Sequence, residues 1–163
     1  MRLPHRRASI DLVPGESELA RASSETGLVV GSREALYVPT SVGHVRVPWE
    51  QVESADWDRE NDVLRVREVG TWGLPRPEYL LTIAEPGRLL ELLRERVTST
   101  VVLQRHVAVD GSRGVRVIAR RAPSGRREVT WLFEYDEGVD PADPVVAQAA
   151  DRALAAARED VGL

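Results

Sequence analysis

The chain has 163 residues, of which 42 % are hydrophobic and 29 % are charged. This length and composition are typical of one ordinary globular domain or of two small ones, and they exclude a chain that is disordered throughout. The net charge of −4 argues against bulk non-specific attraction to nucleic acid or anionic lipid, because that attraction grows with the number of cations offered to phosphates. All 22 basic residues are arginine, as a GC-rich coding sequence would produce.

Cysteine is absent from the sequence, which excludes disulfides, thiolate metal ligands and thiol nucleophiles. The first 16 residues begin with basic side chains, yet no apolar run of the kind found in a signal peptide follows them. No stretch approaches the roughly 20 apolar residues that a membrane-spanning helix needs. We therefore expect a cytoplasmic protein without a membrane span.

The stretch 45–69 carries two tryptophans and two turn signals between apolar alternations that are typical of consecutive antiparallel strands. Alternation predicts that Trp49 and Trp57 belong to the core. Val52 and Trp57 fall out of step with strict alternation, which one bulged residue near Glu53 or Ser54 would restore. The following side chains share the expected inner faces: Val45, Val47, Trp49, Leu64 and Val66. The following acids are expected to face water or turns: Glu53, Asp56, Asp58, Glu60 and Asp62.

Four further elements are expected in the first half of the chain, where order begins near Ile10. Residues 27–38 alternate around a glycine and predict a hairpin that turns at Gly31-Ser32. A strand is expected at 79–83, after a segment rich in glycine and proline. The run 86–97 predicts a helix, because proline suits its first turn and apolar residues recur on one face. That face consists of Leu89, Leu90, Leu93 and Val97.

About seven short strands followed by one amphipathic helix resemble the pleckstrin-homology-like folds. The resemblance covers residues 15 to 98 and rests on element order and on turns such as that in 47–58. It implies two bent antiparallel sheets, a sandwich or barrel, plugged at one end by the helix. The helix lacks the tryptophan typical of eukaryotic members, and the first hairpin lacks their basic cluster for inositol phosphates. Phosphoinositide binding is therefore not expected. As a whole, the chain resembles proteins of high-GC Gram-positive bacteria.

The second half predicts a three-stranded antiparallel meander followed by a helix. Strands are expected at 100–109, 115–119 and 129–135, with turns at 110–111 and 122–125. Asp143 and Pro144 form a typical helix start, and the helix should run to about Asp160. Its small apolar stripe is expected to cover the aromatic face of the third strand. The stripe consists of Val146, Ala150, Ala153, Leu154, Ala157 and Val161. The sequence thus predicts an α+β protein with domains at 10–98 and 99–163, packed as one compact unit.

No motif in the sequence indicates catalysis, a cofactor or a metal. The histidines His5, His44 and His106 have no ligand-like spacing. Acids at 136–143 do not match the spacing of a calcium loop, and we interpret them as caps of the following helix. The sequence contains no GxSxG, no phosphate-binding glycine loop and no HExxH. We therefore predict no catalytic residue, no cofactor and no metal site.

The candidate partner-binding residues surround the hairpin 113–127, where arginines crowd together. Arginine forks suit phosphates and carboxylates equally. The residues are His106, Arg116, Arg120, Arg121, Arg126 and Arg127. Three of them, His106, Arg116 and Arg120, are expected as near neighbours on the outer face of the meander. The alternative is that these arginines solvate an exposed sheet and pair with the acidic loop 134–143 or with a second copy of the chain.

The element order from 86 to 160, helix, three strands and helix, is also that of the double-stranded-RNA-binding domain. That resemblance is topological only, because the family opens its second helix with a basic phosphate-binding motif and this chain has Asp140, Asp143 and Pro144 there. We predict a non-catalytic protein-binding or adaptor module that binds a protein partner or itself. The alternative is an RNA-binding module that uses the hairpin 113–127. A small hydrolase is a more distant alternative.

Overall fold

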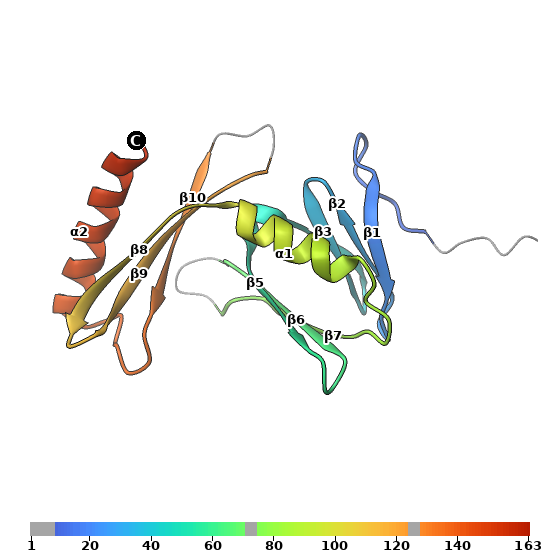
Figure 1. Ribbon diagram of the computed structural model, residues 1–163, viewed down its shortest axis with the longest axis horizontal. Coiled ribbons are helices and arrows are strands. Elements are labelled where there is room, and N and C mark those ends of the chain that lie inside the picture. The colour runs from blue at the N-terminus through green and yellow to red at the C-terminus, as the bar shows by residue number, and fades with distance from the viewer. Residues whose placement is uncertain (1–8, 71–74, 124–127) are drawn as a thin grey trace, which may run out of the picture. The chain divides into compact units, whose positions relative to one another are not determined.

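The computed structural model describes residues 9–70, 75–123 and 128–163, and it forms two compact units, Met1–Thr98 and Ser99–Leu163 (Figure 1). Strands of the first unit are β1 (Glu18–Ser23), β2 (Leu28–Ser32), β3 (Ala35–Thr40), β4 (Gly43–Pro48), β5 (Val52–Asp58), β6 (Val63–Glu68) and β7 (Glu78–Thr82), followed by helix α1 (Leu89–Ser99). The second unit contains β8 (Val101–Asp110), β9 (Arg113–Arg121), β10 (Val129–Tyr135) and helix α2 (Pro144–Asp160). The predicted α+β class, with antiparallel sheets, a meander and a C-terminal helix, is confirmed. The packing of the two halves as one body stays a prediction.

Two antiparallel sheets and α1 enclose the main core of the first unit. The first sheet has the order β1-β2-β3-β4 and the second has the order β5-β6-β7. Trp49, in a short 3₁₀ turn between the sheets, is 0 % exposed, and its Nε1 donates to the Ser32 carbonyl at 3.0 Å. Trp57 packs against the same core but is only half-buried. The prediction that both tryptophans belong to the core is thus right for Trp49 and only partly right for Trp57.

The expected bulge in β5 is present, because the register of β5 against β6 shifts between Val52 and Ser54. The extra residue, Glu53, does not face water as predicted. Its side chain is 9 % exposed and forms an ion pair with Arg76. A bulged residue leaves the strand's alternation, so its direction cannot be inferred from its neighbours.

Gly31 lies inside β2, so the predicted Gly31-Ser32 turn is wrong. The chain turns at Arg33 and Glu34 instead. A Cβ on Gly31 would collide with Cδ2 of Leu92 on α1. The glycine therefore permits the helix to approach the sheet closely, and a close approach is one reason for a glycine inside a strand.

Helix α1 begins at Leu89, three residues later than predicted. Pro86 and Gly87 precede it, and Gly87 has a φ of 52°, which a right-handed helix cannot contain. Leu89, Leu92 and Leu93 are buried in the core, whereas Leu90 is half-buried. The helix therefore has an apolar face wider than the part that the core covers.

The outer face of the first sheet, opposite the main core, is covered by residues 10–16, which we call the strap. Val30, Ala35 and Tyr37 form a second buried cluster on this face, and Ile10 and Leu12 of the strap pack against it. Because Val29 and Leu36 point into the main core, β2 and β3 are buried on both faces. Their continuous apolar runs follow from this double burial.

In the second unit the sheet order is β10-β9-β8, and α2 lies over β8 and β9. Asp143 caps α2 as predicted, because its Oδ1 accepts from the Val145 amide at 2.9 Å. Two small residues of α2, Ala153 and Ala157, form a buried cluster with Val117, and Trp131 and Phe133 of β10 pack against this cluster while staying half-buried. The predicted covering of the β10 aromatics is therefore partial. In the part of the chain that the structure describes, neither helix has the length and hydropathy needed to cross a membrane.

Candidate protein-interaction site

The predicted arginine cluster alternates with carboxylates across the meander. His106 of β8 faces Arg116 of β9, and Arg116 faces Glu134 of β10. Nε2 of His106 lies 2.8 Å from Oδ2 of Asp136, and Nη1 of Arg116 lies 3.8 Å from Oε2 of Glu134. The hydrogen bond from His106 is the largest cause that holds the pKa of Asp136 below its ordinary value. Each of His106 and Arg116 therefore already has a carboxylate beside it within the second unit.

Arg120 does not belong to an exposed patch, contrary to expectation. The residue is 4 % exposed, and its Nη1 donates to the hydroxyl of the fully buried Thr100 at 2.9 Å. Arg121 is half-buried. Arg126 and Arg127 lie outside the described residues. Of the six candidates, the structure thus brings together two partly exposed side chains, His106 and Arg116. Their role in partner binding stays a prediction.

A groove in the first unit lies between α1 and β5, with a volume of about 380 Å³. Its apolar part comes from Trp57 of β5, Leu64 of β6, and Leu90 and Leu93 of α1. The remaining lining residues are Ala55, Asp56, Arg94, Val97 and Thr98. The groove is therefore built from one face of α1 and from the strands β5 and β6, and sequence reasoning did not single it out.

The groove reaches the edge of the second sheet. Within the described residues, β5 pairs only with β6, so its other edge is an outer edge of that sheet. Three consecutive residues, Ala55, Asp56 and Trp57, line the groove. Trp57 and Leu64 are register partners on β5 and β6 and share one face of the sheet, so the groove lies over the face that meets α1 and extends to this edge strand.

Two exposed charges flank the apolar part of the groove. Arg94 stands on α1 and Asp56 on β5. Neither side chain forms an ion pair with another described residue. A guanidinium in this position can bind a carboxylate with two parallel hydrogen bonds. No cluster of three potential metal ligands is found among the residues that the structure describes.

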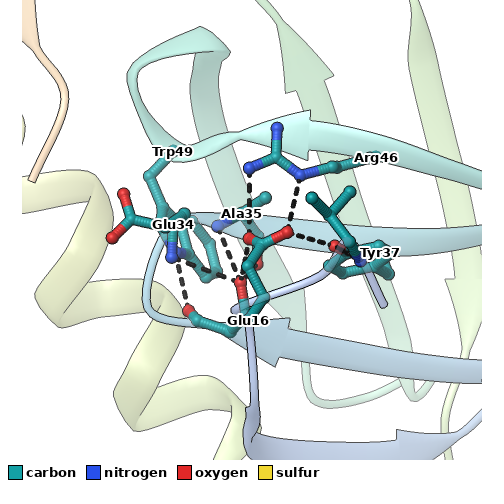
Figure 2. Close-up of polar contacts among 8 residues, drawn as sticks. Glu16, Glu34, Ala35, Tyr37, Arg46 and Trp49 are labelled. Carbon is teal, nitrogen blue, oxygen red and sulfur yellow. Dashed lines mark hydrogen bonds and ion pairs between the residues drawn. The ribbon is translucent and has the colours of Figure 1, made fainter. Parts of the chain in front are cut away.

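A second site lies on the outer face of the first sheet, where side chains from three strands bind the carboxylate of Glu16 (Figure 2). Oε1 accepts from the Ser32 hydroxyl at 2.8 Å and from Nη2 of Arg46 at 3.1 Å. Oε2 accepts from the Tyr37 hydroxyl at 2.5 Å and from Nε of Arg46 at 3.0 Å. Burial alone would raise the pKa of Glu16, but the hydrogen bonds from Arg46, Tyr37 and Ser32 together outweigh burial and lower it.

Comparison with known proteins adds no family to this description, because no family model, no curated protein and no solved structure matches the chain. The pleckstrin-homology-like character of the first unit therefore stays a prediction. Its element order, seven strands and then a helix, is the one that the resemblance implies.

Proposed function

We propose that the chain is a non-catalytic protein-binding module that holds its partner in the groove between α1 and β5. The observation that carries this proposal is the half-buried Trp57 beside the half-buried Leu90 and the exposed Arg94, which forms no ion pair with another described residue. Tryptophan and arginine are the side chains most enriched among the energetically dominant residues of protein interfaces. An apolar surface with a charged rim is typical of such a site.

The lining residues favour a polypeptide over a small substrate. A small-molecule site usually combines an apolar pocket with several convergent polar groups. Among the described residues that line this groove, Thr98 is the only hydroxyl, and there is no histidine to act as its base. This supports a binding role over the distant alternative of a hydrolase.

The meander supports the ranking of protein above RNA as the partner. RNA affinity depends on cations that are free to neutralise phosphates. His106 and Arg116 already lie beside Asp136 and Glu134. A phosphate backbone that binds there would have to displace the carboxylates of Asp136 and Glu134, and this displacement would weaken the binding. RNA binding by the hairpin 113–127 thus ranks second.

Selection of peptides from a random library, followed by affinity measurements with the purified chain, tests this proposal. We expect the selected peptides to combine a bulky apolar residue with an acidic one, and to lose at least about tenfold in affinity when Leu90 is changed to Glu. The matched control is Leu80→Glu, because Leu80 is a 59 % exposed leucine of the same unit outside the groove. Equal affinities of both variants for every selected peptide would contradict the proposal.

A further inference from the structure

The strap is attached to the first sheet by apolar contacts near its start, by one hydrogen bond in its middle and by a carboxylate at its end. Its residues form no strand. Ile10 and Leu12 pack on the outer face of the sheet, and Glu16 supplies the carboxylate at the other end. Between them, the Val13 amide donates to the Tyr37 hydroxyl at 3.0 Å. The strap is therefore a bound segment with two apolar anchors and one charged anchor.

The site under Glu16 is built by the sheet and not by the strap. Its donors come from three neighbouring strands: Ser32 from β2, Tyr37 from β3 and Arg46 from β4. Tyr37 and Arg46 are direct register partners, so strand pairing fixes their relative position. All three donors bind the same carboxylate, whose side chain is only 6 % exposed. Figure 2 shows Tyr37 and Arg46 beside Glu16. Such a preorganised set of donors can bind any carboxylate that reaches it.

The apolar surface next to this site is also formed by the sheet and not by the strap. Val30, Ala35 and Tyr37 all belong to β2 and β3. Without the strap they would form an exposed apolar patch beside a guanidinium, a hydroxyl and a phenol. Exposed patches of this kind mark sites of protein interaction.

We propose that the outer face of the first sheet is a peptide-binding surface that the strap occupies in cis, and that a partner segment of the same chemistry displaces it. The partner segment carries two apolar side chains two residues apart and a carboxylate four residues further on, as Ile10, Leu12 and Glu16 do. This surface is distinct from the groove at α1 and β5, so the inference goes beyond the function proposed above.

The covalent connection of the strap determines when a partner can bind. A tethered segment competes at a high effective concentration, so a free segment of equal intrinsic affinity is largely excluded. Access to the face therefore requires that the strap be weakened, for example by loss of the Glu16 contacts. The strap acts as a cover that sets the apparent affinity of this surface.

A labelled peptide with the sequence of residues 9–17 is the probe, and fluorescence anisotropy with the full-length chain is the measurement. We expect weak binding to the parent chain and binding at least about tenfold tighter to the Glu16→Gln variant, whose own strap lacks the charged anchor. Leu12→Asp, which removes an apolar anchor instead, should have the same effect. Arg94→Gln in the groove should leave the affinity within about twofold of the parent, which separates this result from the test of the groove.

Two comparisons test whether the carboxylate is recognised as proposed. In the Glu16→Gln chain, a peptide that carries Gln in place of its glutamate should bind at least about tenfold more weakly than the unaltered peptide. Adding Arg46→Gln to that chain should abolish the preference for the unaltered peptide. The proposal is overturned if both weakened chains, shown to be folded by circular dichroism and two-dimensional NMR, bind the peptide no better than the parent. It is equally overturned if the two peptides bind the Glu16→Gln chain with equal affinity.

Discussion

Arg46 on β4 and Glu16 in the strap form a two-point ion pair, with Nε to Oε2 at 3.0 Å and Nη2 to Oε1 at 3.1 Å. The two residues are 30 positions apart in sequence. Through this contact, and through Ser32 and Tyr37, a short segment without regular structure is tied to three strands. The relationship explains why the strap has a defined place on the sheet.

Glu16→Gln should lower the free energy of unfolding by about 2 kcal/mol, since a charge-assisted set of hydrogen bonds is replaced by weaker neutral ones. Urea denaturation followed by tryptophan fluorescence measures this loss. The matched control is Glu60→Gln in the exposed turn before β6, which should change stability by less than about 0.5 kcal/mol. Equal stabilities of the two variants would show that the Glu16 contacts contribute nothing.

The stabilisation by Glu16 should depend on pH in a definite direction. Its pKa is lowered from the ordinary value of 4.5 by the hydrogen bonds that outweigh its burial, so the folded state favours the charged form. The contribution is therefore fully present above pH 4.5 and is lost as the pH falls through the lower, folded-state pKa. The difference in unfolding free energy between the parent and Glu16→Gln should shrink over that range. If the difference in unfolding free energy grew on acidification, the pKa of Glu16 would be raised by folding and not lowered.

The two tryptophans of the central stretch should differ in their contribution to stability. Trp49→Ala should cost about 3 to 5 kcal/mol, because the ring is completely buried and its Nε1 donates to Ser32. Trp57→Ala should cost distinctly less, because the ring is already half-exposed at the groove. Denaturant midpoints of the two variants measure the difference. A loss for Trp57 as large as that for Trp49 would place Trp57 in the core and remove it from the groove.

Gly31→Ala should destabilise the first unit by about 1 to 3 kcal/mol, because the added methyl group collides with Leu92. The same substitution should cost less in a Leu92→Ala background, where α1 leaves room for it. A double-mutant cycle measures this coupling. Identical costs in both backgrounds would mean that the close approach of α1 is not what requires glycine.

The local features of the fold could be predicted from short-range patterns. The phase difference between Val52 and Trp57 is sufficient to predict a bulge, because the period of a strand is exactly two residues. Asp143 before Pro144 predicts the start of α2 for a similarly local reason. Both predictions depend on residues within a few positions of one another, where alternation and capping act.

The remaining features depend on contacts between distant residues. Gly31 could mark a turn or a close approach, and only the position of Leu92 decides between them. Alternation assigns Arg120 to a face of the meander, but it does not reveal that this side chain is covered and bonded to Thr100. Glu16 resembles any surface acid, since its three partners come from later strands. The sequence did not reveal the groove because its lining combines residues of a helix and of two strands that lie far apart in sequence.

Chemical-shift mapping with the tightest selected peptide tests the proposed protein-binding role most directly. Two-dimensional NMR of the isotope-labelled chain would be recorded while unlabelled peptide is added. We expect the largest shifts at residues 55–57 of β5, at Leu64, and at Leu90 to Thr98, and we expect Leu90→Glu to remove them while Leu80→Glu does not. Shifts centred on His106 and Arg116 of the meander, with the groove unaffected, would contradict this expectation.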